Sequence, residues 1–405
     1  MQTAILALLL KAAGYDIIIS SFAGVQGSPL LWNGISVMPA GQDAYGSDII
    51  PAHHYHAKAD LVIALLDVWA LNAEAVKGVP IAAWMPVDTD RLADGDHNFL
   101  TVSGAIPIAM SRHGERLLRE AGHNPVYVPH SVDTSVFLPR ADRDELRESA
   151  GLTGKFVIGI MAANKDAIRK GFFPQFEAFA RFRKDHPDAV LMVHSQITSP
   201  GGLDLKRMAQ ETGIEDAVIF SSQYKLLMGL FQQSDVATWL NMIDVLSNAS
   251  MGEGFGITPL EAMACGVPAV VTDCSAMTEL SLGPEWLVPG EPFWNPTHAS
   301  RWAMPYIEHV CPACGYTEGI LDRYRAAYDA LKNPAKAAQV KQAAREKALL
   351  YDANRVFSEY WQPALAEISE RLDAKKIAAA LPAAGEIIEI IEPRKPAVTG
   401  GETNA

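Results

Sequence analysis

The chain has only four cysteines among its 405 residues, at positions 265, 274, 311 and 314. So few thiols do not make the disulfide framework of a secreted protein, so we expect a reducing, cytoplasmic location. Long apolar runs are also lacking. Residues 3–10 are apolar, but they are too few to span a bilayer and follow no basic signal-peptide segment. We expect them to form a first amphipathic helix, and we expect no transmembrane segment.

A surplus of basic residues is missing as well. The net charge is −13 and no run of Lys or Arg offers a stripe that would neutralise phosphates, which argues against general nucleic-acid binding. A local basic pocket for a nucleotide diphosphate stays compatible with this charge. Two nucleotide-binding motifs are absent too. Residues 151–155 lack the glycine spacing of a P-loop, and no Gly-x-Gly-x-x-Gly follows an early strand, which disfavours NTPases and dehydrogenases.

What the chain does have is an alternation of short Val- and Ile-rich runs with helical stretches. This pattern is typical of parallel sheets covered on both faces, and the length suits two domains of Rossmann size. The first series of predicted strands covers residues 16–20, 34–38, 61–66, 80–84, 105–109 and 126–128; the second covers residues 156–161, 189–194, 217–220, 244–247 and 269–272. The sequence therefore predicts an α/β protein with two doubly wound sheets in tandem.

Residues 250–268 carry the most specific pattern. Glu253 and Glu261 are separated by seven residues, and Thr258, Pro259 and Glu261 suit the N-cap, first and third positions of a helix. The glycines at 254 and 256 allow close backbone approach, and free amides at the helix start favour a phosphate there. The alternative is that Glu261 only caps its helix and Glu253 is a solvated loop residue.

This segment resembles the donor-binding signature of the retaining glycosyltransferases of family 4, which have the GT-B fold. The resemblance covers roughly residues 2–372 and is strongest from about residue 159. It implies two Rossmann-like domains that face a cleft, over residues 1–135 and 136–352, and a helix over 353–372 that crosses back to the first domain. Residues 373–405 are expected to be a mobile tail. The family opens with a strand, whereas this chain begins with a helix-like segment, so we expect that first strand to be missing.

The resemblance also implies a set of donor contacts. Glu253 would contact the transferred sugar and Glu261 the nucleotide ribose. Residues 162–171 resemble the loop in which an Arg, and then a Lys before Gly, hold the diphosphate; Lys170 matches that Lys, and Asn164 or Lys165 stands near the Arg position. Either Arg169 or Lys165 could compensate, and a solvated basic turn is the alternative. The further expected donor-binding residues are Ser250, Gly254, Phe255, Gly256, Ile257 and Glu279, the last with a helix-surface carboxylate as its alternative.

Acceptor recognition is expected from the first domain. Asp88 follows a predicted strand, at the edge where open α/β sheets contact ligands, and is a candidate catalytic residue; an ordinary loop Asp is the alternative. A zinc site is the remaining chemical possibility. The Cys311–Cys314 pair and the histidines at 53, 54 and 56 lack a full ligand set at metal spacing, so a structural turn and a polar loop are preferred and no metal is expected.

The resemblance to family 4, together with these patterns, implies a retaining glycosyltransferase. Its donor substrate would be a nucleotide diphosphate sugar, with no cofactor, and its acceptor an unidentified glycan, lipid, protein or small molecule. Lys170 would stabilise the leaving diphosphate and Glu253 would hold the sugar hydroxyls. Two alternatives stay open: a catalytically degenerate GT-B protein that binds nucleotide or glycan, and a zinc-containing accessory protein built around Cys311 and Cys314.

Overall fold

The computed structural model describes residues 1–22, 24–295, 299–312, 315 and 317–372. The described part of the C-terminal half is built on a six-stranded sheet in the order β10-β9-β8-β11-β12-β13, in which every pair is parallel. In chain order this is 3-2-1-4-5-6, the doubly wound arrangement that the sequence predicts. The strands are β8 (Phe156–Met161), β9 (Ala189–His194), β10 (Val218–Phe220), β11 (Val245–Asn248), β12 (Ala269–Thr272) and β13 (Leu287–Val288).

Helices cover both faces of this sheet, and β8 shows how the sequence directs them. Phe156, Ile158 and Ile160 point into a core with the phenylalanines of α6, while Val157 and Met161 point into a second core with α9 and α10. The helices of this half are α5 (Arg143–Ser149), α6 (Phe172–Asp185), α7 (Leu205–Glu211), α8 (Gln223–Leu227), α9 (Gln233–Met242), α10 (Ile257–Ala264), α11 (Met277–Leu280), α12 (Ile320–Lys332) and α13 (Pro334–Leu349).

The N-terminal half differs from the single doubly wound sheet that was predicted. Its strands form two sheets, a parallel one in the order β4-β5-β6-β7 and a three-stranded one in the order β1-β3-β2, in which β2 is antiparallel. The bounds are β1 (Ile18–Ser20), β2 (Leu30–Trp32), β3 (Ile35–Met38), β4 (Val62–Ala64), β5 (Ile81–Met85), β6 (Ile106–Ala109) and β7 (Val126–Tyr127). The helices are α1 (Gln2–Ala12), α2 (Ile50–Ala57), α3 (Asp94–Ser103) and α4 (Arg112–Glu120), so the first apolar segment is helical as expected.

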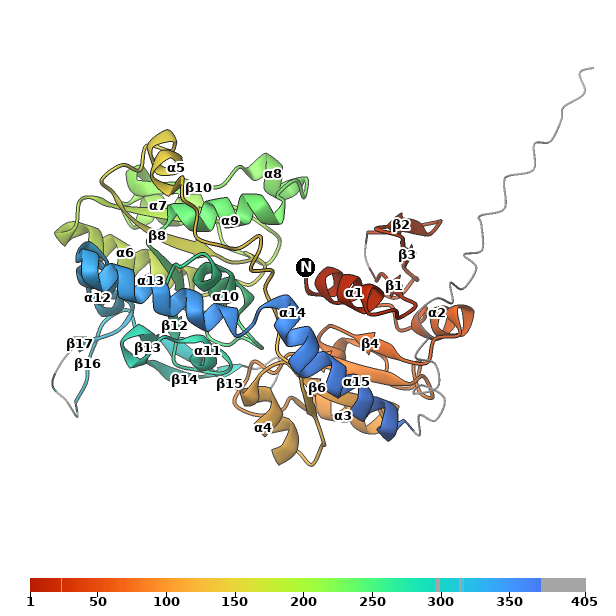
Figure 1. The fold of residues 1–405 in the computed structure, drawn as a ribbon. Coiled ribbons are helices and arrows are strands. Elements are labelled where there is room, and N and C mark those ends of the chain that lie inside the picture. Colours follow the sequence, from red (N-terminus) through yellow and green to blue (C-terminus); the bar gives the residue numbers. More distant parts are fainter. Residues whose placement is uncertain (23, 296–298, 313–314, 316, 373–405) are drawn as a thin grey trace, which may run out of the picture.

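The C-terminal helix returns to the N-terminal half, as predicted. It comprises α14 (Ala353–Val356), a π-helical turn (Phe357–Trp361) and α15 (Gln362–Arg371). Trp361 packs edge-on against Trp84 at 4.8 Å between ring centroids, and Arg371 donates a hydrogen bond of 2.6 Å to the Asn124 carbonyl. Figure 1 shows this blue segment leaving the C-terminal half and crossing to the N-terminal half, where Tyr360 packs edge-on against Tyr127 of β7. The division into domains at residue 135 stays a prediction, and the expected mobile tail lies outside the described residues.

Two antiparallel hairpins after β13 were not predicted. They pair β14 (Gly290–Asn295) with β15 (Ser300–Pro305), and β16 (His309–Val310) with β17 (Thr317–Glu318). In the first hairpin, Trp302 of β15 lies against Gly252, next to the predicted catalytic residue Glu253. A search of the helices in the described residues finds none with the length and apolar character needed to cross a bilayer.

Candidate functional site

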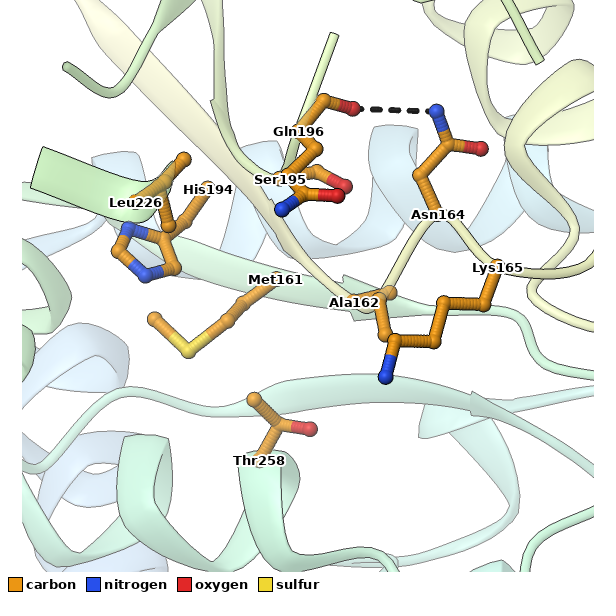
Figure 2. A pocket seen from close by; sticks show the side chains of 10 residues that line it. Met161, Ala162, Asn164, Lys165, His194, Ser195, Gln196, Leu226 and Thr258 are labelled. Carbon is orange, nitrogen blue, oxygen red and sulfur yellow. Dashed lines mark hydrogen bonds between the residues drawn. The ribbon is translucent and has the colours of Figure 1, made fainter. Parts of the chain in front are cut away.

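A cavity of about 360 Å³ opens where β8 and β9 end. Its lining comes from the ends of these two strands, from the loops that follow them, from α8, and from the first turn of α10: Met161, Ala162, Ala163, Asn164, Lys165, His194, Ser195, Gln196, Leu226 and Thr258. Figure 2 shows Thr258 facing the strand ends across this space. Since β8 lies between β9 and β11, the cavity is at the switch point of the sheet, the usual ligand crevice of a doubly wound fold.

Asn164 and Lys165, two of the candidate donor-binding residues in the loop after β8, have different surroundings. The Asn164 side chain is buried and bonded to backbone: its amide donates to the Gln196 carbonyl at 3.0 Å, and its carbonyl accepts from Leu203 N at 2.8 Å. Asn164 therefore connects the loop after β8 to the loop after β9, and it also lines the cavity. Lys165 is exposed, makes no ion pair with the described residues, and extends toward Thr258 in Figure 2. Its ammonium is a cation that a ligand can use.

The start of α10 differs from the predicted capping box. Gly256 is the N-cap with φ of +103°, and Thr258 and Glu261 are the second and fifth helical residues, so neither caps the helix. A left-handed glycine ends the loop two residues earlier than the sequence predicted, because only glycine takes this backbone conformation without strain. The first amides of the helix then remain available beside the cavity, and the helix dipole favours an anion there.

The predicted catalytic residues come together beside this helix start. Lys170 Nζ donates to Glu253 Oε1 at 2.5 Å, and Arg169 Nη1 lies 3.4 Å from Glu253 Oε2 and 3.7 Å from Asp88 Oδ2. Burial alone would raise the pKa of Glu253, yet the charges of Lys170 and then Arg169 outweigh it, so the pKa lies below its ordinary value. Asp88 reaches this cluster from the N-terminal half, three residues after the end of β5, and its catalytic role stays a prediction.

Two contacts with other parts of the chain hold the loop around Glu253 in place. The Glu253 backbone N–H donates to the Ser275 hydroxyl at 3.0 Å, and Ser275 has a φ of +48°, which is a strained conformation for a residue with a side chain. Gly254 lies so close to the N-terminal half that an added Cβ would be 2.3 Å from the Pro86 Cβ. Sequence reasoning missed Ser275, although it follows a predicted strand end.

Glu261 lies behind the cluster, in the protein interior. Its side chain is 6% exposed, no described residue makes a hydrogen bond to its carboxylate, and burial raises its pKa to about 8. Phe255 is also buried, where its ring packs edge-on against His130 and Tyr351. The Ser250 hydroxyl donates to Asn248 Oδ1 at 2.8 Å. These side chains shape the loop from inside, and Ile257 is half-buried at the helix start.

Glu279 joins the two halves of the molecule. Its carboxylate accepts hydrogen bonds from the backbone N–H groups of Arg112 at 3.0 Å and His113 at 2.8 Å, the first two residues of α4. A carboxylate at this position satisfies free amides and complements the helix dipole. In this arrangement Glu279 contacts the N-terminal half, and its predicted donor contact stays a prediction.

Several cavity residues were missed by sequence reasoning: His194, Ser195, Gln196 and Leu226. The signal was available for the first three, since they stand at the end of a strand whose bounds were predicted correctly. Burial lowers the pKa of His194, whose Nδ1 lies 2.9 Å from the Ser221 hydroxyl. The Ser195 hydroxyl is buried without a partner among the described residues and lines the cavity. It is therefore ready to bond a polar ligand atom.

The described residues contain no cluster of three or more His, Cys, Asp or Glu side chains that could hold a metal ion. His53 instead lies 2.8 Å from the Ser20 hydroxyl, and the His309 ring stacks on Tyr306 at 4.3 Å between centroids. Cys314 lies outside the described residues, so the Cys311–Cys314 pair is not tested.

Comparisons with known proteins bear on the fold and on the second half of the chain. Residues 142–281 match the family model for glycosyl transferases group 1. The sucrose-phosphate synthase of Thermosynechococcus elongatus superposes with a TM-score of 0.66 at 18% identity, covering 90% of this chain and 92% of that one. The chain has the GT-B fold. Another GT-B structure, Anabaena HepE in complex with UDP-glucose, superposes with a TM-score of 0.61 at 16% identity over 92% of this chain and 96% of its own.

Among curated proteins, the lipopolysaccharide core biosynthesis mannosyltransferase LpsB of Rhizobium meliloti is 29% identical over 158 residues, which are 38% of this chain and 42% of that protein. The chain spans about half the length of the first curated relatives that it matches. The residues that match the family model include the loop after β8, Glu253 and Glu261. They do not include Asp88, which lies in the N-terminal half.

Proposed function

We propose that this protein is a retaining glycosyltransferase of family 4 that moves a hexose, with mannose as the first candidate, from a nucleoside diphosphate sugar to an acceptor in the cleft. The observation that carries the proposal is the pairing of Glu253 with Lys170 and Arg169 just before the start of α10, the helix whose Thr258 lines the switch-point cavity. The group 1 match and the mannosyltransferase similarity support the transfer of a sugar. The proposal keeps the cytoplasmic location expected from the sequence.

The site contains cations and amides suited to a departing diphosphate. Lys165 makes no ion pair with the described residues. Lys170 and Arg169 are paired with the carboxylate of Glu253, so a bound donor would replace these ion pairs with contacts to its phosphates. The first amides of α10 add fixed partial positive charge, which stabilises the charge that develops as the glycosidic bond to phosphate breaks. The family resemblance supports a role for Glu261 at the nucleotide ribose, and its buried carboxyl group has no hydrogen-bond partner among the described residues.

Asp88 and Glu253 would then flank the reacting sugar from opposite halves of the molecule. In the proposed reaction the acceptor hydroxyl attacks the anomeric carbon on the face that the diphosphate leaves, and the departing phosphate takes the hydroxyl proton. No side chain is bonded to the sugar in this scheme. Glu253 holds the sugar hydroxyls, and Lys170 balances the charge of the diphosphate.

The test is release of nucleotide from a panel of UDP-, GDP- and other nucleotide-activated hexoses with a crude glycan extract as acceptor, followed by mass spectrometry of the product. We expect release with at least one donor, and a Glu253→Gln variant that binds the nucleotide but turns over ~100-fold more slowly, a typical loss for one positioned group. The matched control is Glu211→Gln, since Glu211 lies on α7 and is 71% exposed. Nucleotide binding with no release from any donor would contradict the proposal and favour a binding protein.

A further inference from the structure

The β14–β15 hairpin follows the segment that matches the family model and joins both halves of the molecule. Three successive residues of β15 make the connection. Arg301 exchanges two hydrogen bonds with Asp90 of the N-terminal half: Asp90 N donates to the Arg301 carbonyl at 3.2 Å, and Arg301 N donates to Asp90 Oδ1 at 2.8 Å. Ala303 N donates to the Met251 carbonyl of the C-terminal half at 2.9 Å. Strand β15 is thus hydrogen-bonded to the loop at Asp90 through Arg301 and to the loop at Met251 through Ala303.

Trp302 stands between these two attachments. Gly252 is enclosed from both sides: an added Cβ would lie 2.2 Å from the Asp88 carbonyl oxygen and 2.9 Å from Trp302 Cδ1. No side chain at position 252 fits this space, so the indole, the glycine and the Asp88 backbone form one contact. Gly252 immediately precedes Glu253, and its carbonyl accepts from Arg169 Nη1 at 3.3 Å. A shift of the Trp302 indole would therefore move the backbone at Gly252, and with it the positions of Glu253 and Arg169.

We propose that the β14–β15 hairpin is a clasp across the cleft and that Trp302 is a positioning residue, which holds the Asp88 loop against the Gly252–Glu253 loop. This inference rests on the proposed function for its effect on transfer, although the clasp itself is a property of the fold. The hairpin fixes the position of Asp88 relative to Glu253. It therefore sets the geometry of the reacting groups and leaves the nucleotide cavity, at the ends of β8 and β9, unchanged. A displacement of ~1 Å between reacting groups is enough to slow a reaction ~100-fold.

The hairpin supplies its own control residue. Because side chains of a strand alternate between faces, the cross-strand pair Phe293–Trp302 lies on one face and the pair Trp294–Arg301 on the other. Trp294 is 57% exposed, so its indole is largely in solvent. Trp302→Ala and Trp294→Ala thus remove the same side chain from the same hairpin, and only the first removes the contact with Gly252.

Two measurements test the clasp. The first needs no donor: amide hydrogen exchange of residues 86–91 in the full chain. We expect Trp302→Ala to speed exchange there at least tenfold and Trp302→Phe to speed it less, while Trp294→Ala leaves it as in the wild type. The second is kinetic: Trp302→Ala should lower kcat by ~tenfold or more, with the dissociation constant of the nucleotide diphosphate within twofold of the wild type. A purely structural role would instead lower nucleotide affinity and folded yield together.

Equal exchange of residues 86–91 in the two Trp→Ala variants overturns the inference. Should Trp302→Ala fail to fold, Trp302→Phe and Asp90→Ala take its place, since Asp90→Ala removes one anchor of the hairpin and is expected to speed the same exchange. If the wild type releases nucleotide from no donor, the proposed function fails, and the exchange measurement still decides the clasp. Faster exchange with unchanged kcat overturns the positioning role of Trp302.

Discussion

Replacing the buried carboxyl of Glu261 with an amide is expected to stabilise the protein by an amount that grows with pH. Glu261 is 6% exposed, has no hydrogen-bond partner among the described residues, and burial raises its pKa to about 8, compared with an ordinary value of 4.5. The folded protein therefore holds a proton that the unfolded chain gives up. In Glu261→Gln this difference is absent, because the amide does not ionise.

The sign and size of the effect follow from proton linkage. Below pH 4.5 the carboxyl is protonated in both states and the two proteins differ little. Between pH 4.5 and about 8 the unfolded chain is ionised while the folded protein stays protonated, so the wild type loses ~1.4 kcal/mol of unfolding free energy per pH unit relative to the variant. Above about 8 both states are ionised and the difference levels off, at ~5 kcal/mol if the whole shift is realised.

Urea unfolding followed by tryptophan fluorescence at pH 5, 6, 7, 8 and 9 measures this directly. The midpoint of Glu261→Gln should rise above that of the wild type progressively from pH 5 to 8 and then stay parallel to it. Glu211→Gln, which replaces an exposed carboxylate, should follow the wild type throughout. A constant offset between wild type and Glu261→Gln across all five pH values would refute the account of a buried, protonated carboxyl.

Three further predictions concern the loops and the second half of the molecule. Gly171→Ala should lower the unfolding free energy by ~2 kcal/mol and slow transfer, because Gly171 has φ of +59° and an added Cβ would lie 2.3 Å from the Ala249 carbonyl oxygen; normal activity would contradict this. Lys165→Ala should weaken binding of a nucleotide diphosphate ~tenfold in calorimetry, the loss of one charge-assisted bond, and unchanged affinity would remove Lys165 from the phosphate site. Asp244→Ala should cost ~3–5 kcal/mol in urea unfolding, since it leaves buried Arg147 unpaired; a loss under 1 kcal/mol would show that the pair is solvated.

Much of the C-terminal sheet could be predicted because its strands are buried on both faces. The strands at 156–161, 189–194 and 269–272 have the predicted bounds, since fully buried parallel strands are continuous apolar runs. The N-terminal half was predicted less well. Asn33 and Gly34 both have positive φ and form the two-residue turn of the β2–β3 hairpin, a signal that is visible in the sequence and was not used.

The candidate site shows the same division between local and long-range information. The sequence pattern predicts Glu253 and Lys170 in one cluster, and in the structure Lys170 Nζ lies 2.5 Å from Glu253 Oε1. The start of α10 was predicted wrongly, because a left-handed Gly256 replaced side-chain capping. The bonds of Glu279 to α4 join residues 166 and 167 positions apart, and no local pattern reports such a contact. Asn164 likewise bonds to a loop whose position depends on the whole sheet.

In the proposed reaction a diphosphate binds between the start of α10 and the cations of the loop after β8. A crystal structure of the protein with UDP or GDP tests it most directly. We predict the diphosphate within hydrogen-bond distance of Lys165, Lys170 and the amides after Gly256, with Lys170 released from Glu253. A nucleotide bound elsewhere, with the Lys170–Glu253 pair intact, would contradict the account.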